Sequence, residues 1–243
     1  VTVQPTITVS LQNLNLTNGN TASEGGGIRF ALGDGTGMLN LTNVHIYGNT
    51  GVWGGGLWVG PDAEVTGENV QIYDNTATDL GGGLRLYGGR ATFSASNIYN
   101  NVAPMGAGVY ATRENGFDPA LNLPDSADIY DNDALTGDGL GGGLYLREGT
   151  VSLADCSDIY ANNAIDGGGA YLITSTLTIA SDCSEIMLNT ATGNGGGVVA
   201  LDSVVNLDDS AELYDNTAGI NGGGAYLDNS DLWGDKASIH YNT

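Results

Sequence analysis

Four acidic residues occupy equivalent places in a repeated pattern, each directly before an aliphatic residue that Tyr or Met follows: Asp128, Asp158, Glu185 and Glu212. On stacked strands, these carboxylates would lie about 4.8 Å apart. Two such charges repel by about 1 kcal/mol in water, and by more where screening is poorer. The column is therefore a candidate cation site, with Ca²⁺ as the cofactor, or a carboxylate pair with one raised pKa. The alternative interpretation is a solvated acidic stripe.

Two further columns are aromatic. The residue after the same aliphatic position gives the candidate binding residues Tyr73, Tyr99, Tyr130, Tyr160 and Tyr214. A second column contains Trp58, Tyr110, Tyr145, Tyr171 and Tyr226, interrupted by Arg29, Arg85 and Val199. Such rings can stack on the sugar rings of a neutral glycan, or they can stack on one another and cover the sheet.

The two cysteines share a column as well. Cys156 and Cys183 each lie six residues before a repeated Asn. Stacked residues about 4.8 Å apart at Cα fall inside the disulfide range, although parallel strands in register are a difficult geometry. A disulfide would suit an exported protein. The alternative is two small thiols that fill a column.

A repeat positions all of these residues. Its Asn recurs at gaps of 26 to 31 residues, and we align Asn20, Asn49, Asn75, Asn101, Asn132, Asn162, Asn189, Asn216 and Asn242. A Gly triplet follows most copies. Apolar residues alternate within each copy, as in VSLADCSDIY, which predicts about three short strands. One copy cannot bury its own inner face, so the copies must stack as a parallel β-helix.

Stacking assigns a role to each column. The core would be Ile46, Ile72, Ile98, Ile129, Ile159, Ile186, Leu213 and Ile239, with small residues two positions earlier. The structural ladder, in which each Asn turns the chain and bonds the Asn one coil away, would be Asn49, Asn75, Asn101, Asn132, Asn162, Asn189 and Asn216. The Gly triplets supply positive φ or a close backbone approach.

Three segments carry a resemblance to a known class: NTATDLGGGLRL (75–86), NTATGNGGGVVAL (189–201) and NTAGINGGGAYL (216–227). They resemble the right-handed parallel β-helix repeats of bacterial surface and secreted proteins of the "GGGIY" type, and are similar to chlamydial polymorphic outer-membrane protein repeats. The resemblance implies an all-β, single-stranded right-handed parallel β-helix. Such folds include lyases, adhesins and inert stalks.

The repeat predicts one domain, 1–243, of about eight to nine coils. We expect an irregular first coil at 1–24, a protruding loop at 111–124 and an incomplete last coil at 225–243. Residues that break the period leave the coil as a loop, and such loops are common places for specific contacts. The open strand edges at both ends suggest either a segment of a longer surface protein or a subunit that binds its own copies head to tail.

Composition limits the partners. With 28 acids against 6 bases the net charge is −22, which disfavours nucleic acid and anionic membrane surfaces. No apolar run reaches the roughly 18 residues of a membrane helix. The chain lacks a basic cluster for an acidic sugar, and its two His are His45 and His240. We therefore expect a non-catalytic structural or adhesive protein, extracellular or at the cell surface, with a neutral glycan or a surface receptor as its candidate partner. A calcium-stabilised glycan-binding module and a glycan-cleaving enzyme are the alternatives.

Overall fold

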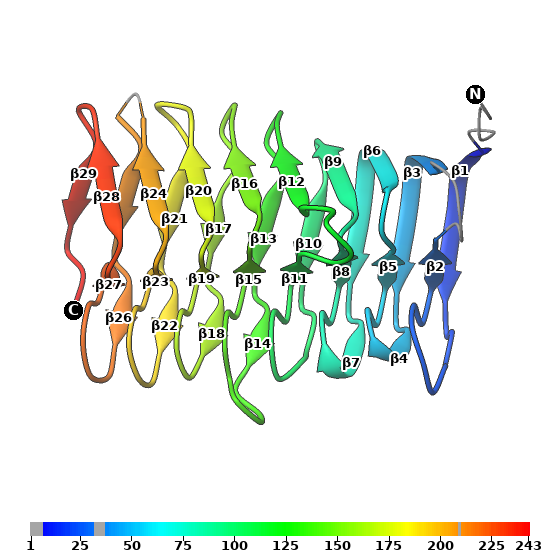
Figure 1. The fold of residues 1–243 in the computed structure, drawn as a ribbon, viewed down its shortest axis with the longest axis horizontal. Helices are drawn as coiled ribbons and strands as arrows, with labels where there is room; N and C mark the ends of the chain where they lie inside the picture. Colours follow the sequence, from blue (N-terminus) through cyan, green and yellow to red (C-terminus); the bar gives the residue numbers. More distant parts are fainter. Residues whose placement is uncertain (1–6, 32–36, 209) are drawn as a thin grey trace.

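The chain forms a β-solenoid in which each coil adds strands to a set of long sheets. The structure is a computed structural model that describes residues 7–31, 37–208 and 210–243. Within these ranges there is no helix, and the strands that pair across coils are parallel (Figure 1). One sheet takes one strand per coil and has eight strands, which gives eight coils. The predicted all-β, right-handed parallel β-helix is confirmed.

The eight-stranded sheet follows the Gly triplets and forms one wall of the solenoid. Its strands are β2 (Ile28–Phe30), β5 (Leu57–Val59), β8 (Leu84–Tyr87), β11 (Val109–Thr112), β15 (Leu144–Arg147), β19 (Ala170–Ile173), β23 (Val198–Leu201) and β27 (Ala225–Asp228). The first Gly of each triplet turns the chain into this sheet. Gly141, for example, has a φ of +67°, and a Cβ there would lie 2.3 Å from the carbonyl oxygen of Leu144. A side chain is therefore excluded at this corner.

The largest sheet has 15 strands and two branches. In the first coils one long strand spans both branches: β1 (Ile7–Thr17), β3 (Gly37–Tyr47) and β6 (Ala63–Tyr73). In later coils two shorter strands, one in each branch, replace this long strand. One branch contains β9 (Arg90–Ser94), β12 (Ala120–Leu123), β16 (Thr150–Leu153), β20 (Thr176–Ile179), β24 (Val204–Leu207) and β28 (Asp231–Gly234). The other contains β10 (Asn97–Tyr99), β13 (Asp128–Tyr130), β17 (Ile159–Tyr160), β21 (Glu185–Met187), β25 (Glu212–Tyr214) and β29 (Ser238–His240).

A further short strand follows the repeated Asn in six coils, and the prediction of about three strands missed it. These strands form a two-stranded sheet of β4 (Thr50–Trp53) and β7 (Thr76–Leu80), and a four-stranded sheet of β14 (Asp133–Ala134), β18 (Asn163–Ala164), β22 (Thr190–Ala191) and β26 (Thr217–Ala218). Most are two residues long. A two-residue strand cannot show the alternation by which strands are recognised in a sequence.

Equivalent residues of successive coils stack on one another. Ile129 pairs with Ile159 and Tyr130 with Tyr160, as the repeat alignment predicts. The inward aliphatic column is 0–2% exposed from Ile46 to Leu213. Burial of each such side chain contributes roughly 1.5–3 kcal/mol. Ile239, in the last coil, pairs with Leu213 but is 51% exposed, because no further coil of this chain packs on it.

The predicted departures from the repeat have the following structure. Residues 1–6 of the first coil lie outside the described residues, and β1 pairs with β3 in the register of the later coils. In the predicted loop 111–124, residues 111–112 belong to β11 and residues 120–123 to β12, so 113–119 and Pro124 lie outside the strands. The chain after β27 adds β28 and β29.

Candidate functional site

The repeated Asn side chains form a continuous buried ladder from Asn49 to Asn216. In each coil the Oδ1 of one Asn accepts both the backbone N–H and the side-chain N–H of the Asn one coil earlier, as between Asn132 and Asn162, at 3.0 Å each. The Nδ2 of Asn162 also donates to the carbonyl oxygen of Ile129, at 3.0 Å. The ladder therefore supplies hydrogen bonds to backbone groups that are shielded from water.

The alignment of Asn20 with this ladder is wrong. Gly19, not Asn20, occupies the ladder position, and its backbone N–H donates to Oδ1 of Asn49 at 2.8 Å. Asn20 instead pairs with Thr50, one position later. At the opposite end the pattern continues, because Asn242 accepts the backbone N–H of Asn216 at 2.9 Å.

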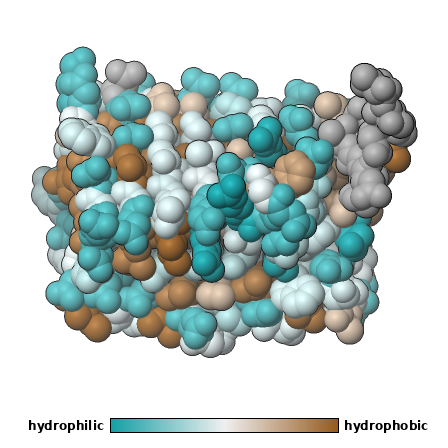
Figure 2. All heavy atoms as spheres, in the orientation of Figure 1, coloured by the Kyte–Doolittle hydropathy of each residue, from teal (hydrophilic) through white to brown (hydrophobic). Residues whose placement is uncertain are grey.

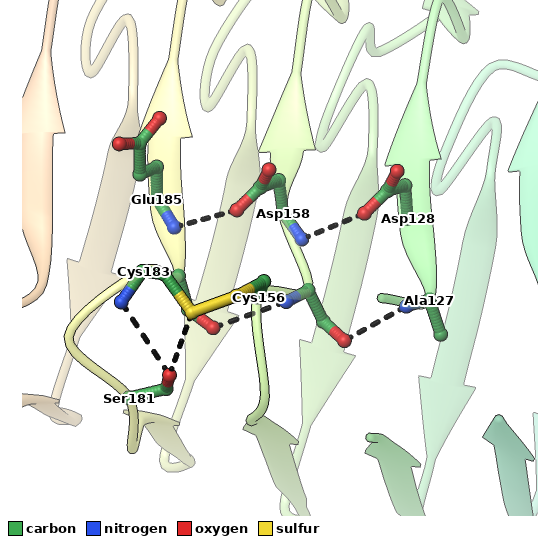
Figure 3. Close-up of a disulfide and its surroundings, with 9 residues drawn as sticks. Ala127, Asp128, Cys156, Asp158, Ser181, Cys183 and Glu185 are labelled. Carbon is green, nitrogen blue, oxygen red and sulfur yellow. Dashed lines mark hydrogen bonds between the residues drawn. A yellow bond between two sulfur atoms is a disulfide. The ribbon is translucent and has the colours of Figure 1, made fainter. Parts of the chain in front are cut away.

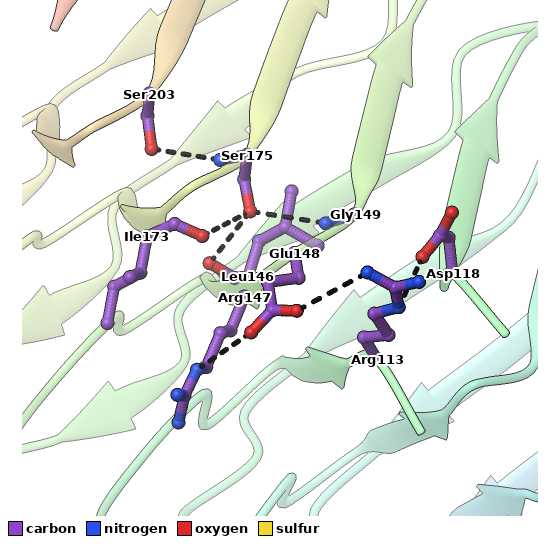
Figure 4. A network of polar contacts seen from close by, with 9 residues as sticks. All are labelled: Arg113, Asp118, Leu146, Arg147, Glu148, Gly149, Ile173, Ser175 and Ser203. Atoms are coloured by element: carbon purple, nitrogen blue, oxygen red, sulfur yellow. Dashed lines mark hydrogen bonds and ion pairs between the residues drawn. The ribbon is translucent and has the colours of Figure 1, made fainter. Parts of the chain in front are cut away.

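Serine hydroxyls form a second kind of ladder, which we did not predict. Ser157, in the column predicted to hold small residues, accepts the backbone N–H of Ala127 at 2.9 Å and donates its own N–H to Ser184 Oγ at 3.1 Å. At another corner, Ser175 accepts from the backbone N–H of Gly149 and donates its N–H to Ser203 Oγ, at 3.1 Å (Figure 4). A serine in an otherwise small, buried column is the sequence signal for these ladders.

The acidic column lies where it was predicted, on one outward line of adjacent coils. Oδ1 of Asp128 accepts the backbone N–H of Asp158 at 3.0 Å, and Oδ1 of Asp158 accepts that of Glu185 at 2.8 Å (Figure 3). Glu212 pairs in register with Glu185 on the next strand. Two of the four carboxylates thus bind the backbone of the next coil.

Burial raises the pKa of two carboxyls in this column. It raises the pKa of Asp158 to about 7, and repulsion from Asp128 and Glu185 adds to the rise, while the hydrogen bond from the Glu185 N–H opposes it. Burial also raises the pKa of Asp128. In the described part of the chain, no group of three or more His, Cys, Asp or Glu side chains is arranged to hold a metal ion. The calcium site stays a prediction.

Cys156 and Cys183 are joined by a disulfide beside this column (Figure 3). Their Cα atoms are 4.6 Å apart, and the bond links two consecutive coils across 27 residues of sequence. Cys156 has a φ of +63°, and the preceding Asp155 has a φ of +52°. A corner, rather than the straight part of a strand, therefore supplies the backbone geometry around this bond.

The tyrosine column stacks on itself. The rings of Tyr73, Tyr99, Tyr130 and Tyr160 are parallel within 7°, with centroids 4.8–4.9 Å apart, and Tyr47 extends the stack at one end. Both faces of the inner rings are therefore covered by neighbouring tyrosines. Tyr214 lies beyond Met187, and its hydroxyl donates to Glu185 at 2.9 Å. Burial, followed by this hydrogen bond, raises the pKa of Tyr214 to about 12.

The middle of the second aromatic column is outward yet almost fully buried. Trp58, Arg85 and Tyr110 are adjacent in this column and at most 8% exposed. The guanidinium of Arg85 lies 4.8 Å from the ring centre of Tyr87 and 5.3 Å from that of Trp53, which are cation–π distances. Within the described residues, Nε1 of Trp58 and Nε of Arg85 are buried without a hydrogen-bond partner. Neighbouring side chains on the same outer face cause this burial. The alternation of residues along a strand does not reveal such neighbours.

The non-repetitive segment 113–119 is a small hairpin that lies over the solenoid wall. Glu114 and Phe117 exchange two backbone hydrogen bonds, of 3.1 and 2.8 Å, around Asn115 and Gly116, which both have positive φ. Asn-Gly with two positive φ values is typical of a type I′ turn. Arg113 lies 3.0 Å from Asp118 within the segment, and its Nη1 lies 3.8 Å from a carboxylate oxygen of Glu148 in the next coil (Figure 4).

The fold and these columns define the class of protein: a parallel β-solenoid with buried polar ladders and one disulfide. Comparison with protein-family models, with curated proteins and with solved structures gives no match for this chain. No helix among the described residues has the length and apolar character needed to cross a membrane.

Proposed function

We propose that this chain is an extracellular structural and adhesive solenoid of the cell surface, without catalytic activity. The observation that carries the proposal is the set of contacts that the repeated side chains make between coils. The Asn ladder, the tyrosine stack and two carboxylates of the acidic column all contact the equivalent group or the backbone one coil away. These contacts run along the axis and strengthen cohesion between coils, which is what a rigid rod requires.

One further observation supports an extracellular location. Cys156 and Cys183 form a disulfide, and such bonds persist in oxidising compartments. The net charge of −22 bears on the choice of partner, because it disfavours binding to anionic polymers. The calcium-stabilised version of this role has less support, because Asp128 and Asp158 each use one carboxylate oxygen to accept a backbone N–H.

The rod can be extended at both ends of the described structure. Among the described strands, β1 pairs only with β3, and β29 only with β25. An open parallel edge pairs either with further coils of a longer protein or with a second copy, head to tail. Both continuations preserve the structural role. Sizing chromatography at several concentrations distinguishes them, because self-stacking gives a mass that rises with concentration.

Labelling of intact source cells tests the proposed location. An antibody raised against the purified solenoid should label cells that have not been permeabilised, and external protease should remove the label. Label that appears only after permeabilisation would contradict the proposal. Display of the chain on a non-adherent bacterium then tests adhesion. The control is a variant displayed at equal density, whose solenoid is unfolded by Asn132→Ala and Asn162→Ala.

A further inference from the structure

The hairpin 113–119 closes one side of a pocket that the repeat alone would not form. The pocket has a volume of about 230 Å³ and lies at the corner between the eight-stranded sheet and the 15-stranded sheet. It is lined by Gly37, Met38, Asp62, Ala63, Glu64, Gly88, Arg90 and Phe117. Hydrophilic residues gather at the centre of this face in Figure 2, where Figure 1 shows the segment between β11 and β12. Pockets for drug-sized ligands are typically about 300–1,000 Å³, so this one suits a smaller ligand.

The hairpin is held in place on both sides, so Phe117 has a defined position. On one side, the backbone of Glu114 and Phe117 lies against Gly88, where an added Cβ would be 3.1 Å from the Glu114 carbonyl oxygen and 3.2 Å from Phe117 Cβ. Tyr87, which directly precedes Gly88, has its pKa raised by a hydrogen bond to Glu114. On the other side, Arg113 donates its backbone N–H to the carbonyl oxygen of Arg147, at 3.2 Å.

The chemistry of the lining fits a sugar ring. Phe117 is 38% exposed and lies outside both aromatic columns, so its ring does not belong to the tyrosine stack. Glu64 and Arg90 pair in register on adjacent strands, which brings a carboxylate and a guanidinium to the same wall, and Asp62 adds a second carboxylate. Sugar hydroxyls both donate and accept hydrogen bonds, so they suit acceptor carboxylates beside a donor guanidinium. The apolar C–H face of a pyranose suits an aromatic ring.

We propose that this pocket binds one neutral hexopyranose unit of a surface glycan, with Phe117 against the ring face and Glu64 and Arg90 on its hydroxyls. The acidic charge of the chain favours a neutral sugar over a uronic acid. The site deepens the proposed adhesive role and rests on it for its biological meaning. It also replaces the tyrosine column as the sugar-binding candidate, because the inner tyrosine faces contact each other.

Saturation-transfer NMR on the purified chain tests the site. The probes are the methyl pyranosides of glucose, galactose, mannose and N-acetylglucosamine, with methyl glucuronide as the charged comparison. At least one neutral probe should receive saturation at its ring C–H protons, and Phe117→Ala and Glu64→Gln should each weaken its binding tenfold or more. Glu68→Gln, four residues along the same strand β6, is the matched control and should leave binding unchanged.

Three results would overturn the assignment: no transfer to any neutral probe, equal transfer in Phe117→Ala, or tighter binding of methyl glucuronide than of the neutral sugars. Phe117 is exposed on a hairpin, so its replacement should leave the melting temperature within about a degree of the unmodified chain. The readout is independent of labelling on intact cells. A chain that labels at the surface but fails to bind these probes refutes the pocket and leaves the structural role standing.

Discussion

The side-chain Nδ2 of Asn132 donates to Oδ1 of Asn162, one coil along the axis, at 3.0 Å. Asn132 is fully buried and also accepts from both the backbone and the side chain of Asn101. Its Nδ2 additionally lies within hydrogen-bond distance of the carbonyl oxygen of Ile98. Each ladder Asn thus connects three coils, and its loss would leave buried partners without a hydrogen bond.

Asn132→Ala should therefore be strongly destabilising. An unsatisfied buried polar group costs about 1–3 kcal/mol, and this change leaves at least two, so we expect a loss of roughly 3 kcal/mol or more in the free energy of unfolding. Urea denaturation followed by circular dichroism gives the value. Asn122→Ala is the control, because Asn122 is exposed and its change should cost less than about 0.5 kcal/mol. Equal losses in the two variants would refute the structural role of the ladder.

Tyr130→Ala should destabilise the solenoid through lost stacking. The ring lies between Tyr99 and Tyr160, at centroid distances of 4.9 and 4.8 Å. Each aromatic pair contributes about 0.5–1.5 kcal/mol beyond its buried area, so the loss should be at least about 1 kcal/mol. Tyr130→Phe keeps both stacked faces and should lie close to the unmodified chain in the same denaturation assay. A large loss in Tyr130→Phe would instead assign the stabilisation to the hydroxyl.

Stability should fall as pH rises from about 4 to about 7 because of Asp158. Its pKa is about 7 in the folded chain and near ~3.9 when unfolded. Between these values the folded chain keeps a proton that the unfolded chain has lost, so each rise in pH favours the unfolded state; above the folded value the contribution is constant. Differential scanning calorimetry should give a lower melting temperature at about pH 8 than at about pH 5.

Asp158→Asn tests the assignment of that pH dependence. The amide oxygen can still accept the Glu185 N–H, but the side chain no longer ionises, so the difference in melting temperature between the two pH values should shrink. Glu212→Gln, in the same column, is the matched control. An undiminished difference in Asp158→Asn would place the titration elsewhere. Calcium added at about pH 8 tests the predicted calcium site: a rise in melting temperature that is lost in Asp158→Asn would place the ion in the acidic column.

The sequence was a good guide wherever like residues stack on like residues. The register of Ile129 on Ile159, the tyrosine stack and the adjacency of Cys156 and Cys183 all follow from aligning the repeats. Stacking preserves the spacing of the repeat, so an alignment of copies is also a map of contacts. The first coil lacks the Ile-Tyr pair that anchors the alignment, which is why Asn20 was placed where Gly19 belongs.

Other features depend on three-dimensional surroundings that a repeat alignment does not contain. The burial of Arg85 comes from Trp53 and Tyr87, which lie in other columns of the same face. The pocket beside Phe117 combines a hairpin from one coil with residues of earlier coils. The sequence showed that 111–124 breaks the period, and its Asn-Gly pair indicated the turn. It did not indicate the surface on which the hairpin lies.

The disulfide should stabilise the solenoid as well as indicate its compartment. It closes a segment of 27 residues, for which chain-entropy arguments give roughly 3 kcal/mol. Replacement of both Cys156 and Cys183 by Ser should lower the free energy of unfolding by about that amount. The unmodified chain under reductant should behave like the double variant. A melting temperature unaffected by reductant would show that the bond contributes little.

The state of Cys156 and Cys183 in the native protein tests the extracellular role most directly. Source cells are quenched in acid, free thiols are alkylated, and the protein is digested without reductant for mass spectrometry. We predict one disulfide-linked peptide pair containing Cys156 and Cys183, with no alkylated form of either residue, in material that external protease can reach on intact cells. Recovery of both residues as alkylated free thiols, in material that external protease cannot reach, would contradict the account.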